Sequence, residues 1–236
     1  MSTAAVLFDV DGTLVDSNYL HVHAWQRAFA EVGVDVEAWR IHRGIGMDGS
    51  SLLEELLSEV SCHGDGDDVS ARAKDLHSRF YMETAHLLKP LPGARRLLDL
   101  VAATGLQVVL ATSAPEDELA LLRKLLDQED VISAVTSSDD VDVAKPKPDI
   151  VEVALQRAGV DADGAVFVGD AIWDIRAATR AGVECIGVQS GGVDLLRLRE
   201  EGAVAVYRNP GDLADHLDDS PIGHLAPAAS LSPRSS

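Results

Sequence analysis

The second half of this chain alternates without interruption between short apolar runs and segments with helical periodicity. Strands separated by helices pair in parallel, and each connecting helix covers one face of the sheet. The sequence therefore predicts an α/β fold, a Rossmann-like, doubly wound parallel sheet. The expected strands are residues 4–8, 107–111, 131–136, 165–168, 184–188 and 203–206.

Between the first two expected strands the sequence shows only helical spacing. Leu20, Ala24 and Ala28 recur every four residues, which is the repeat of one face of a helix. We expect this stretch to form a separate helical unit over the sheet. The expected domains are a core of residues 1–16 and 88–218, an inserted all-helical cap of residues 17–87, and a disordered, Ser-, Pro- and Ala-rich tail of residues 219–236.

The composition limits the possible partners. The 236 residues carry a formal net charge of −19, which argues against nucleic acid and anionic membranes, because these bind basic surfaces. A small phosphorylated metabolite is still allowed, since it needs only a local positive site. Neither cysteine has metal-type spacing, no signal peptide is recognisable and no apolar run reaches membrane-spanning length, so we expect a cytoplasmic protein. The sequence leaves open whether it is a monomer or a homodimer.

The first apolar run ends in two carboxylates, Asp9 and Asp11. Alternate side chains of a strand point to the same side, so the two carboxylates leave the strand together. At about 4 Å such a pair repels by roughly 4 kcal/mol at an effective dielectric constant of 20, and a cation, a proton or a reaction has to compensate for this. A plain Asp-Gly turn is the simpler alternative for this stretch taken alone.

Polar side chains also follow the other expected strands. The second strand is followed by Thr112 and Ser113, the third by Lys145, and the fourth by Asp170, with Asp174 one helical turn later. The carboxyl ends of parallel strands meet at one edge of the sheet, where open α/β sheets bind their ligands. Several carboxylates at that edge fit a hard divalent cation such as Mg²⁺, while the hydroxyl and ammonium groups fit phosphoryl oxygens.

These four segments, in this order, resemble the sequence motifs of the haloacid dehalogenase (HAD) superfamily. Asp9-Val10-Asp11-Gly12-Thr13 is similar to its first motif, Thr112 to the second, Lys145 with Pro146 to the third, and Gly169-Asp170 through Asp174 to the fourth. The resemblance covers residues 4–206 and depends on the ordered set, since each motif is short. The helical stretch between the first two motifs resembles the cap of the subgroup that includes phosphoglycolate phosphatase and β-phosphoglucomutase.

The resemblance implies a Mg²⁺-dependent phosphatase that hydrolyses a phosphate monoester of a small metabolite through an aspartyl-phosphate. Asp9 would attack phosphorus, and Asp11 would protonate the leaving oxygen and then activate water. Thr112, Ser113 and Lys145 would hold the phosphoryl group. The implied metal ligands are Asp9, Asp170 and the backbone carbonyl of Asp11, with Asp174 as a further ligand or as the partner of one.

Three residues of the expected cap are candidates for substrate contact. His21 follows Asp11 by ten residues, at the place where the resemblance to β-phosphoglucomutase implies a functional histidine. Met47 lies in a Gly-rich turn where the mutase pattern has an arginine that grips a second phosphate. Methionine cannot do this, which favours a phosphatase, although Arg43 lies close by in the sequence. The alternatives are a sugar phosphomutase and a non-enzymatic phospho-acceptor protein, and Asp11 argues against the latter because it would speed dephosphorylation.

Overall fold

The computed structural model describes residues 4–58, 66–140, 145 and 147–226 of the chain. Its centre is a six-stranded sheet with the strand order β3-β2-β1-β4-β5-β6, in which every neighbouring pair is parallel. This confirms the predicted α/β, Rossmann-like fold. The strands are β1 (Ala5–Phe8), β2 (Gln107–Ala111), β3 (Ile132–Thr136), β4 (Ala165–Gly169), β5 (Glu184–Val188) and β6 (Ala205–Tyr207).

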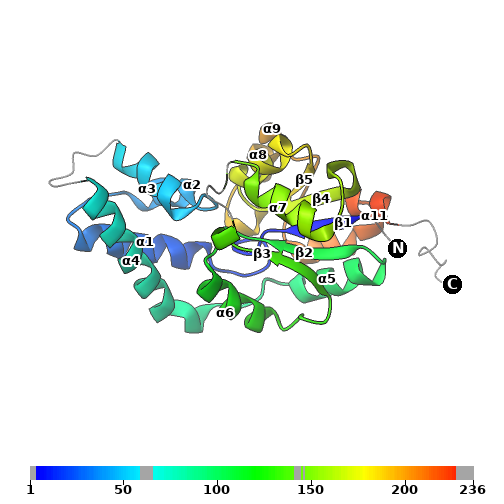
Figure 1. The fold of residues 1–236 in the computed structure, drawn as a ribbon, viewed down its shortest axis with the longest axis horizontal. Coiled ribbons are helices and arrows are strands. Elements are labelled where there is room, and N and C mark those ends of the chain that lie inside the picture. The colour runs from blue at the N-terminus through cyan, green and yellow to red at the C-terminus, as the bar shows by residue number, and fades with distance from the viewer. Residues whose placement is uncertain (1–3, 59–65, 141–144, 146, 227–236) are drawn as a thin grey trace.

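Helices cover both faces of the sheet (Figure 1). Successive side chains of β1 point to opposite faces, so Leu7 belongs to one apolar cluster and Phe8 to the other. Both side chains are completely buried, as expected for a parallel strand between two helical layers. The helices on the Leu7 side are α7 (Asp149–Ala158), α8 (Ile172–Arg180) and α9 (Leu195–Glu201), and those on the Phe8 side are α5 (Ala94–Ala103), α6 (Glu116–Leu126), α10 (Pro210–Asp215) and α11 (Pro221–Leu225).

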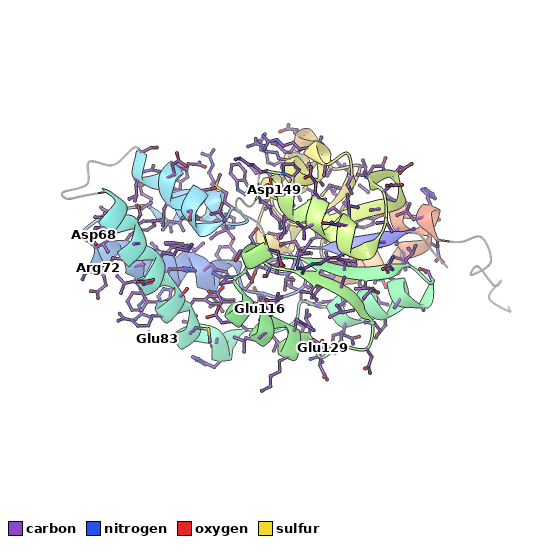
Figure 2. The ribbon with its side chains drawn as sticks, in the orientation of Figure 1. Asp68, Arg72, Glu83, Glu116, Glu129 and Asp149 are labelled. Carbon is purple, nitrogen blue, oxygen red and sulfur yellow. The ribbon has the colours of Figure 1, made fainter. Side chains whose placement is uncertain are left out.

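Four helices between β1 and β2 lie together at one end of the sheet (Figure 1), and we call residues 18–87 the helical insertion. They are α1 (Asn18–Glu31), α2 (Ala38–Gly44), α3 (Gly49–Ser58) and α4 (Gly66–Thr84). The longest of them, α4, buries Ala73, His77 and Tyr81, which are spaced four residues apart. The charged side chains of Arg72 and Glu83 are exposed on its other side (Figure 2). The domain boundaries at 17 and 87 stay a prediction.

The tail was expected to be disordered from residue 219 on, but its first part forms a helix. The chain continues as α11 after Asp219, with Ser220 at its N-cap, where the hydroxyl accepts a hydrogen bond from the backbone N of Ile222 at 3.2 Å. Ile222 is completely buried in the cluster on the Phe8 side of the sheet. The composition was misleading because Pro221 is well suited to the first position of a helix. Residues 227–236 lie outside the described part of the chain.

Within the described ranges, no helix combines the length and the apolar character that crossing a lipid bilayer requires.

Candidate active site

The loops after three neighbouring strands meet at the carboxyl edge of the sheet. Because β1 lies between β2 and β4, the residues that follow these strands are brought side by side. Asp9 directly follows β1, Thr112 follows β2 and Asp170 follows β4, while Asp174 lies in the first turn of α8. This is the edge at which open α/β sheets bind ligands, and it gathers the residues that the sequence singled out.

A buried cluster of acidic residues forms at this edge. Asp9, Asp170 and Asp174 each place one carboxylate oxygen within 4.8 Å of the others. The ammonium group of the completely buried Lys145 lies between two of them, with Nζ 2.5 Å from Oδ1 of Asp9 and 2.7 Å from Oδ1 of Asp174. Burial raises the pKa of Asp9 to about 7, and the neighbouring carboxylates add to this while Lys145 opposes it. Burial and the charge of Asp174 also raise the pKa of Asp170. One ammonium group therefore does not neutralise the cluster.

The donor set fits a hard divalent cation, because it consists of carboxylate oxygens close enough to share one ion. Asp9 and Asp170 have the atoms to hold such an ion. Asp174 has a different position: its Oδ2 accepts hydrogen bonds from the backbone N of Asp170 at 3.1 Å and of Ala171 at 2.9 Å, and its Oδ1 pairs with Lys145. Asp174 therefore stays a candidate for both expected roles, a ligand of the ion or the partner of one.

Two side chains fix the orientation of Asp170. The Thr13 hydroxyl donates to Oδ1 at 2.9 Å, and the Asn18 amide donates to Oδ2 at 2.8 Å and to the carbonyl of Gly191 at 3.2 Å. Gly191 ends the short 3-10 turn η4 (Gln189–Gly191). A Cβ atom at Gly191 would lie 1.6 Å from Oδ2 of Asp170, so only glycine fits at this point. Sequence reasoning missed Asn18, since nothing in its local pattern points to a partner 152 residues away.

Asp11 has a different environment from Asp9. The Ser17 hydroxyl donates to its Oδ1 at 2.6 Å, and Nε2 of His21 lies 3.4 Å from the same oxygen. Burial raises the pKa of Asp11, but the hydrogen bonds from His21 and Ser17 and the charge of His21 outweigh it and hold the pKa below its ordinary value. Two donors on one oxygen orient the carboxyl group and leave the second oxygen for a ligand.

The hydroxyl groups after β2 complete the site. Thr112 is buried and fixed, because its Oγ1 accepts a hydrogen bond from the backbone N of Ala114 at 3.0 Å. The Ser113 hydroxyl is also buried, and it has no hydrogen-bond partner among the described residues. Both residues line the pocket. A buried hydroxyl without a partner is costly, which supports a ligand oxygen as the missing partner of Ser113.

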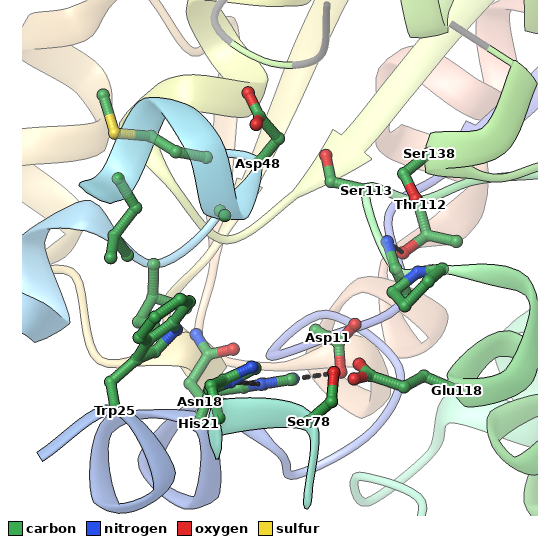
Figure 3. A pocket seen from close by; sticks show the side chains of 18 of the residues that line it. Asp11, Asn18, His21, Trp25, Asp48, Ser78, Thr112, Ser113, Glu118 and Ser138 are labelled. Atoms are coloured by element: carbon green, nitrogen blue, oxygen red, sulfur yellow. Dashed lines mark hydrogen bonds and ion pairs between the residues drawn. The ribbon is translucent and has the colours of Figure 1, made fainter. Parts of the chain in front are cut away.

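A pocket of about 320 Å³ opens between the carboxyl edge of the sheet and the helical insertion. In Figure 3, Asp11, Ser78 and Glu118 point toward one another on one side, and Thr112 and Ser113 lie on another. Its polar and aromatic lining from the core comprises Asp9, Asp11, Thr112, Ser113, Glu118, Ser138 and Asp170, and that from the insertion comprises Asn18, His21, Trp25, Asp48, Ser50, Lys74, His77 and Ser78.

The structure shows which of the three candidate residues from the expected cap line the pocket. His21 and Met47 line the pocket. Arg43 does not: it is exposed, its guanidinium lies 5.9 Å from the ring centroid of Trp39, and its backbone carbonyl accepts a hydrogen bond from Nε1 of Trp173. Arg43 thus lies outside the pocket lining in this arrangement of helices, and its contact with substrate stays a prediction.

Sequence reasoning also missed pocket residues on α4 and α6. Lys74 and His77 come from α4, and Glu118 from the first turn of α6. Glu118 is only 3 % exposed, and burial raises its pKa to about 7. The charge of His21 and the hydrogen bond from Ser78 lower the pKa by smaller amounts, and the charge of Asp11 raises it. A glutamate in a first helical turn normally stabilises the positive end of the helix, so its sequence context gave no sign of a buried carboxyl group.

Comparisons with known proteins show the family of the chain. The model of the family described as haloacid dehalogenase-like hydrolase matches residues 6–188. A phosphorylated carbohydrates phosphatase from Thermotoga maritima is 30% identical over 205 residues, which are 86% of this chain and 94% of that protein. A phosphoglycolate phosphatase from Rhodospirillum rubrum is 32% identical over 225 residues, with 90% of each chain covered. The solved structure of a hydrolase from Pseudomonas syringae has a TM-score of 0.86 and 36% identity, over 92% of this chain and 98% of that one.

The family match includes all four segments that meet at the sheet edge, from Asp9 to Asp174. It also spans the helical insertion between β1 and β2. The chain belongs to the haloacid dehalogenase-like hydrolases.

Proposed function

We propose that this hydrolase is a Mg²⁺-dependent phosphatase that cleaves the phosphate monoester of a small metabolite through a phosphorylated Asp9. The observation that carries the proposal is the contrast between two carboxylates at one strand end. Asp9 belongs to the acidic cluster and contacts the ammonium group of Lys145. Asp11 instead contacts the hydroxyl of Ser17 and the imidazole of His21. One carboxylate beside a cation site and a second in a separate hydrogen-bonded setting suit a nucleophile and an acid–base catalyst.

In the first half-reaction, an oxygen of Asp9 attacks phosphorus and the bond from phosphorus to the ester oxygen breaks. The electron pair of that bond goes to the ester oxygen, which takes a proton from Asp11. Lys145 and the hydroxyls of Thr112 and Ser113 hold the equatorial phosphoryl oxygens, so most of the catalysis is positioning and charge stabilisation. Bound Mg²⁺, held by Asp9 and Asp170, would supply further positive charge next to the phosphoryl group.

In the second half-reaction, water attacks the phosphorus of the aspartyl-phosphate, the bond to Asp9 breaks and Asp11 takes the proton of the water. The pKa of Asp11, which His21 and Ser17 hold low against the effect of burial, keeps this carboxyl charged, and the charged form is the one that can take up a proton. A phosphate dianion bound beside Asp11 disfavours a second negative charge there, and this supports the protonated form that the first half-reaction needs.

The pocket supports a small, polar leaving group. Its volume of about 320 Å³ is at the lower end of the range for small-molecule sites. Asp48, Lys74 and Ser78 offer hydrogen-bonding groups around the space left by the phosphate, and Trp25 offers an apolar face. The relatives named above are called phosphatases of phosphoglycolate and of phosphorylated carbohydrates, and substrates of that size are the ones to test first.

A phosphomutase is the second candidate, and the pocket contains one observation in its favour. Such an enzyme needs a second cationic group to grip the other phosphate of a bisphosphate. Among the described residues that line the pocket, Lys74 is the lysine on the insertion side. Met47 offers no charge and Arg43 lies outside the pocket, so the phosphatase has the stronger support.

The test is phosphate release from p-nitrophenyl phosphate and from a panel of metabolite phosphates, with Mg²⁺ and with EDTA. We expect activity that EDTA abolishes and that Asp9→Asn abolishes, while Asp9→Asn still melts cooperatively. Turnover by Asp9→Asn at the wild-type rate would refute the proposal. A hexose 1-phosphate in the panel, followed by NMR, separates hydrolysis from conversion to the 6-phosphate.

A further inference from the structure

The proposed mechanism leaves one buried histidine of the pocket without a role. His77 lies on α4 and is only 8 % exposed. Its ring stacks on Trp25 with the centroids 4.1 Å apart and the planes at 17°. Its Nε2 lies 3.1 Å from Nδ1 of His21, which makes a hydrogen bond between two imidazoles across 56 residues of sequence.

This hydrogen bond belongs to a chain that ends at the proposed proton donor. Nε2 of His21 lies 3.4 Å from Oδ1 of Asp11, so His21 connects His77 to that carboxyl group. Tyr81 stacks on the His21 ring with the centroids 3.9 Å apart and the planes at 7°. Stacking fixes the plane of the imidazole but does not fix which of its nitrogens faces Asp11.

The hydrogen bond to His77 supplies that missing constraint. An ionised carboxylate only accepts hydrogen bonds, so Nε2 of His21 must carry a proton when it faces Asp11. Nδ1 of His21 then either donates to Nε2 of His77 or accepts from it. Both arrangements keep Nδ1 occupied and leave the Nε2–H group directed at Asp11. A His21 ring without this partner is free to turn and to take Nε2 away from the carboxyl group.

We propose that His77 is a positioning residue that acts through His21 to hold Asp11 in the orientation for proton transfer to the leaving group. The inference rests on the proposed function, since it takes Asp11 as the acid. It assigns no contact between His77 and the reacting atoms.

The test uses the fact that leaving groups differ in their need for a proton. p-Nitrophenolate leaves without protonation, whereas the alkoxide of glycerol 3-phosphate needs a proton from Asp11. The value of kcat/KM reports the steps up to the first cleavage, so the ratio of kcat/KM for the two substrates isolates the proton transfer from the later attack of water. A purely structural role of His77 would lower both values alike.

The variants His77→Gln and His77→Asn carry the same amide group at different distances from the backbone. The amide of glutamine reaches the place of Nε2, where it can donate or accept, while the amide of asparagine ends short of it. We expect His77→Asn to lower kcat/KM for glycerol 3-phosphate about tenfold and that for p-nitrophenyl phosphate less than about twofold, the size of one lost hydrogen bond. His77→Gln should restore most of the difference. His23→Asn is the matched control, since His23 is an exposed histidine on α1, and it should change neither value.

The outcomes are distinguishable. Equal losses on both substrates, unchanged kinetics of His77→Asn, or a glutamine variant no better than the asparagine variant would overturn the role of His77. Thermal melting of each variant shows whether the fold is intact, and the comparison of glutamine with asparagine holds even where both lose some stability. Failure of the proposed function has its own signature: the wild-type protein hydrolyses neither substrate, or Asp11→Asn changes both kcat/KM values equally.

Discussion

Lys145 offers a direct test of the buried acidic cluster, through the substitution Lys145→Met. Its side chain is completely buried, with Nζ 2.5 Å from Asp9 and 2.7 Å from Asp174. Methionine keeps much of the volume and removes the charge. The carboxylates of Asp9 and Asp174 are still buried in the variant, so their desolvation penalty stays. The attraction to the ammonium group, which compensates for that penalty in the wild type, is lost.

Removing one partner of a buried ion pair costs about 3–5 kcal/mol of unfolding free energy. For a chain of 236 residues, about 2–4 °C of melting temperature corresponds to each kcal/mol, which gives a decrease of roughly 6–20 °C in EDTA. Added Mg²⁺ should recover part of this loss, because a divalent ion neutralises the same carboxylates. The loss of a donor to the phosphoryl group should also lower kcat by about 10²–10³.

The assay is thermal unfolding in EDTA and in Mg²⁺, with p-nitrophenyl phosphate hydrolysis on the same samples. Lys147→Met is the matched control, because Lys147 lies two residues away and is exposed, and its melting temperature should equal that of the wild type. A Lys145→Met protein that melts within about 2 °C of the wild type in EDTA would refute the reasoning, since that corresponds to at most about 1 kcal/mol by the same conversion.

Two further substitutions test the surroundings of the site. Gly191→Ala places a Cβ atom 1.6 Å from Oδ2 of Asp170, so we expect the variant to need at least about tenfold more Mg²⁺ for half-maximal hydrolysis, and an unchanged Mg²⁺ titration would contradict this. Glu118→Gln concerns pH: because burial raises the folded-state pKa of Glu118 from 4.5 to about 7, its contribution to stability is complete below about pH 4.5 and is lost as the pH rises through 7. In metal-free buffer the unfolding free energy of the wild type should fall by up to about 3 kcal/mol relative to that of Glu118→Gln as the pH rises from about 4.5 to about 7. Curves of unfolding free energy against pH that run parallel for the two proteins would contradict this.

The residues at the sheet edge were predictable from sequence for a physical reason. Asp9, Thr112 and Asp170 each directly follow a strand of a parallel sheet, and parallel strands bring their carboxyl ends together whatever their order. The strand order itself, β3-β2-β1-β4-β5-β6, was not predicted, because apolar runs of similar length carry no information about their neighbours. The edge at which these residues lie follows from the ends of the strands alone, whereas their side-by-side placement also depends on β1 lying between β2 and β4.

The residues of the helical insertion were not predictable in the same way. A helix has no privileged end that always faces the ligand, and the face it presents depends on how it packs against the core. Arg43 and His77 illustrate this. The sequence indicated Arg43 because of its distance along the chain from Met47, yet its side chain lies over Trp39. His77 had no motif, yet it hydrogen-bonds to a histidine 56 residues away.

This difference has a mechanistic consequence. Asp9 is held by Lys145 and by the acidic cluster, all of which belong to the core, in the loops after the strands or in the first turn of α8. Asp11 is held by His21, which belongs to α1, and His21 in turn contacts α4. A change in the packing of α4 against His21 therefore acts first on the proposed acid, whereas the contact of Lys145 with the proposed nucleophile lies outside the insertion. Substitutions between α1 and α4 should change which leaving groups are cleaved, whereas substitutions at the strand ends should abolish cleavage of all of them.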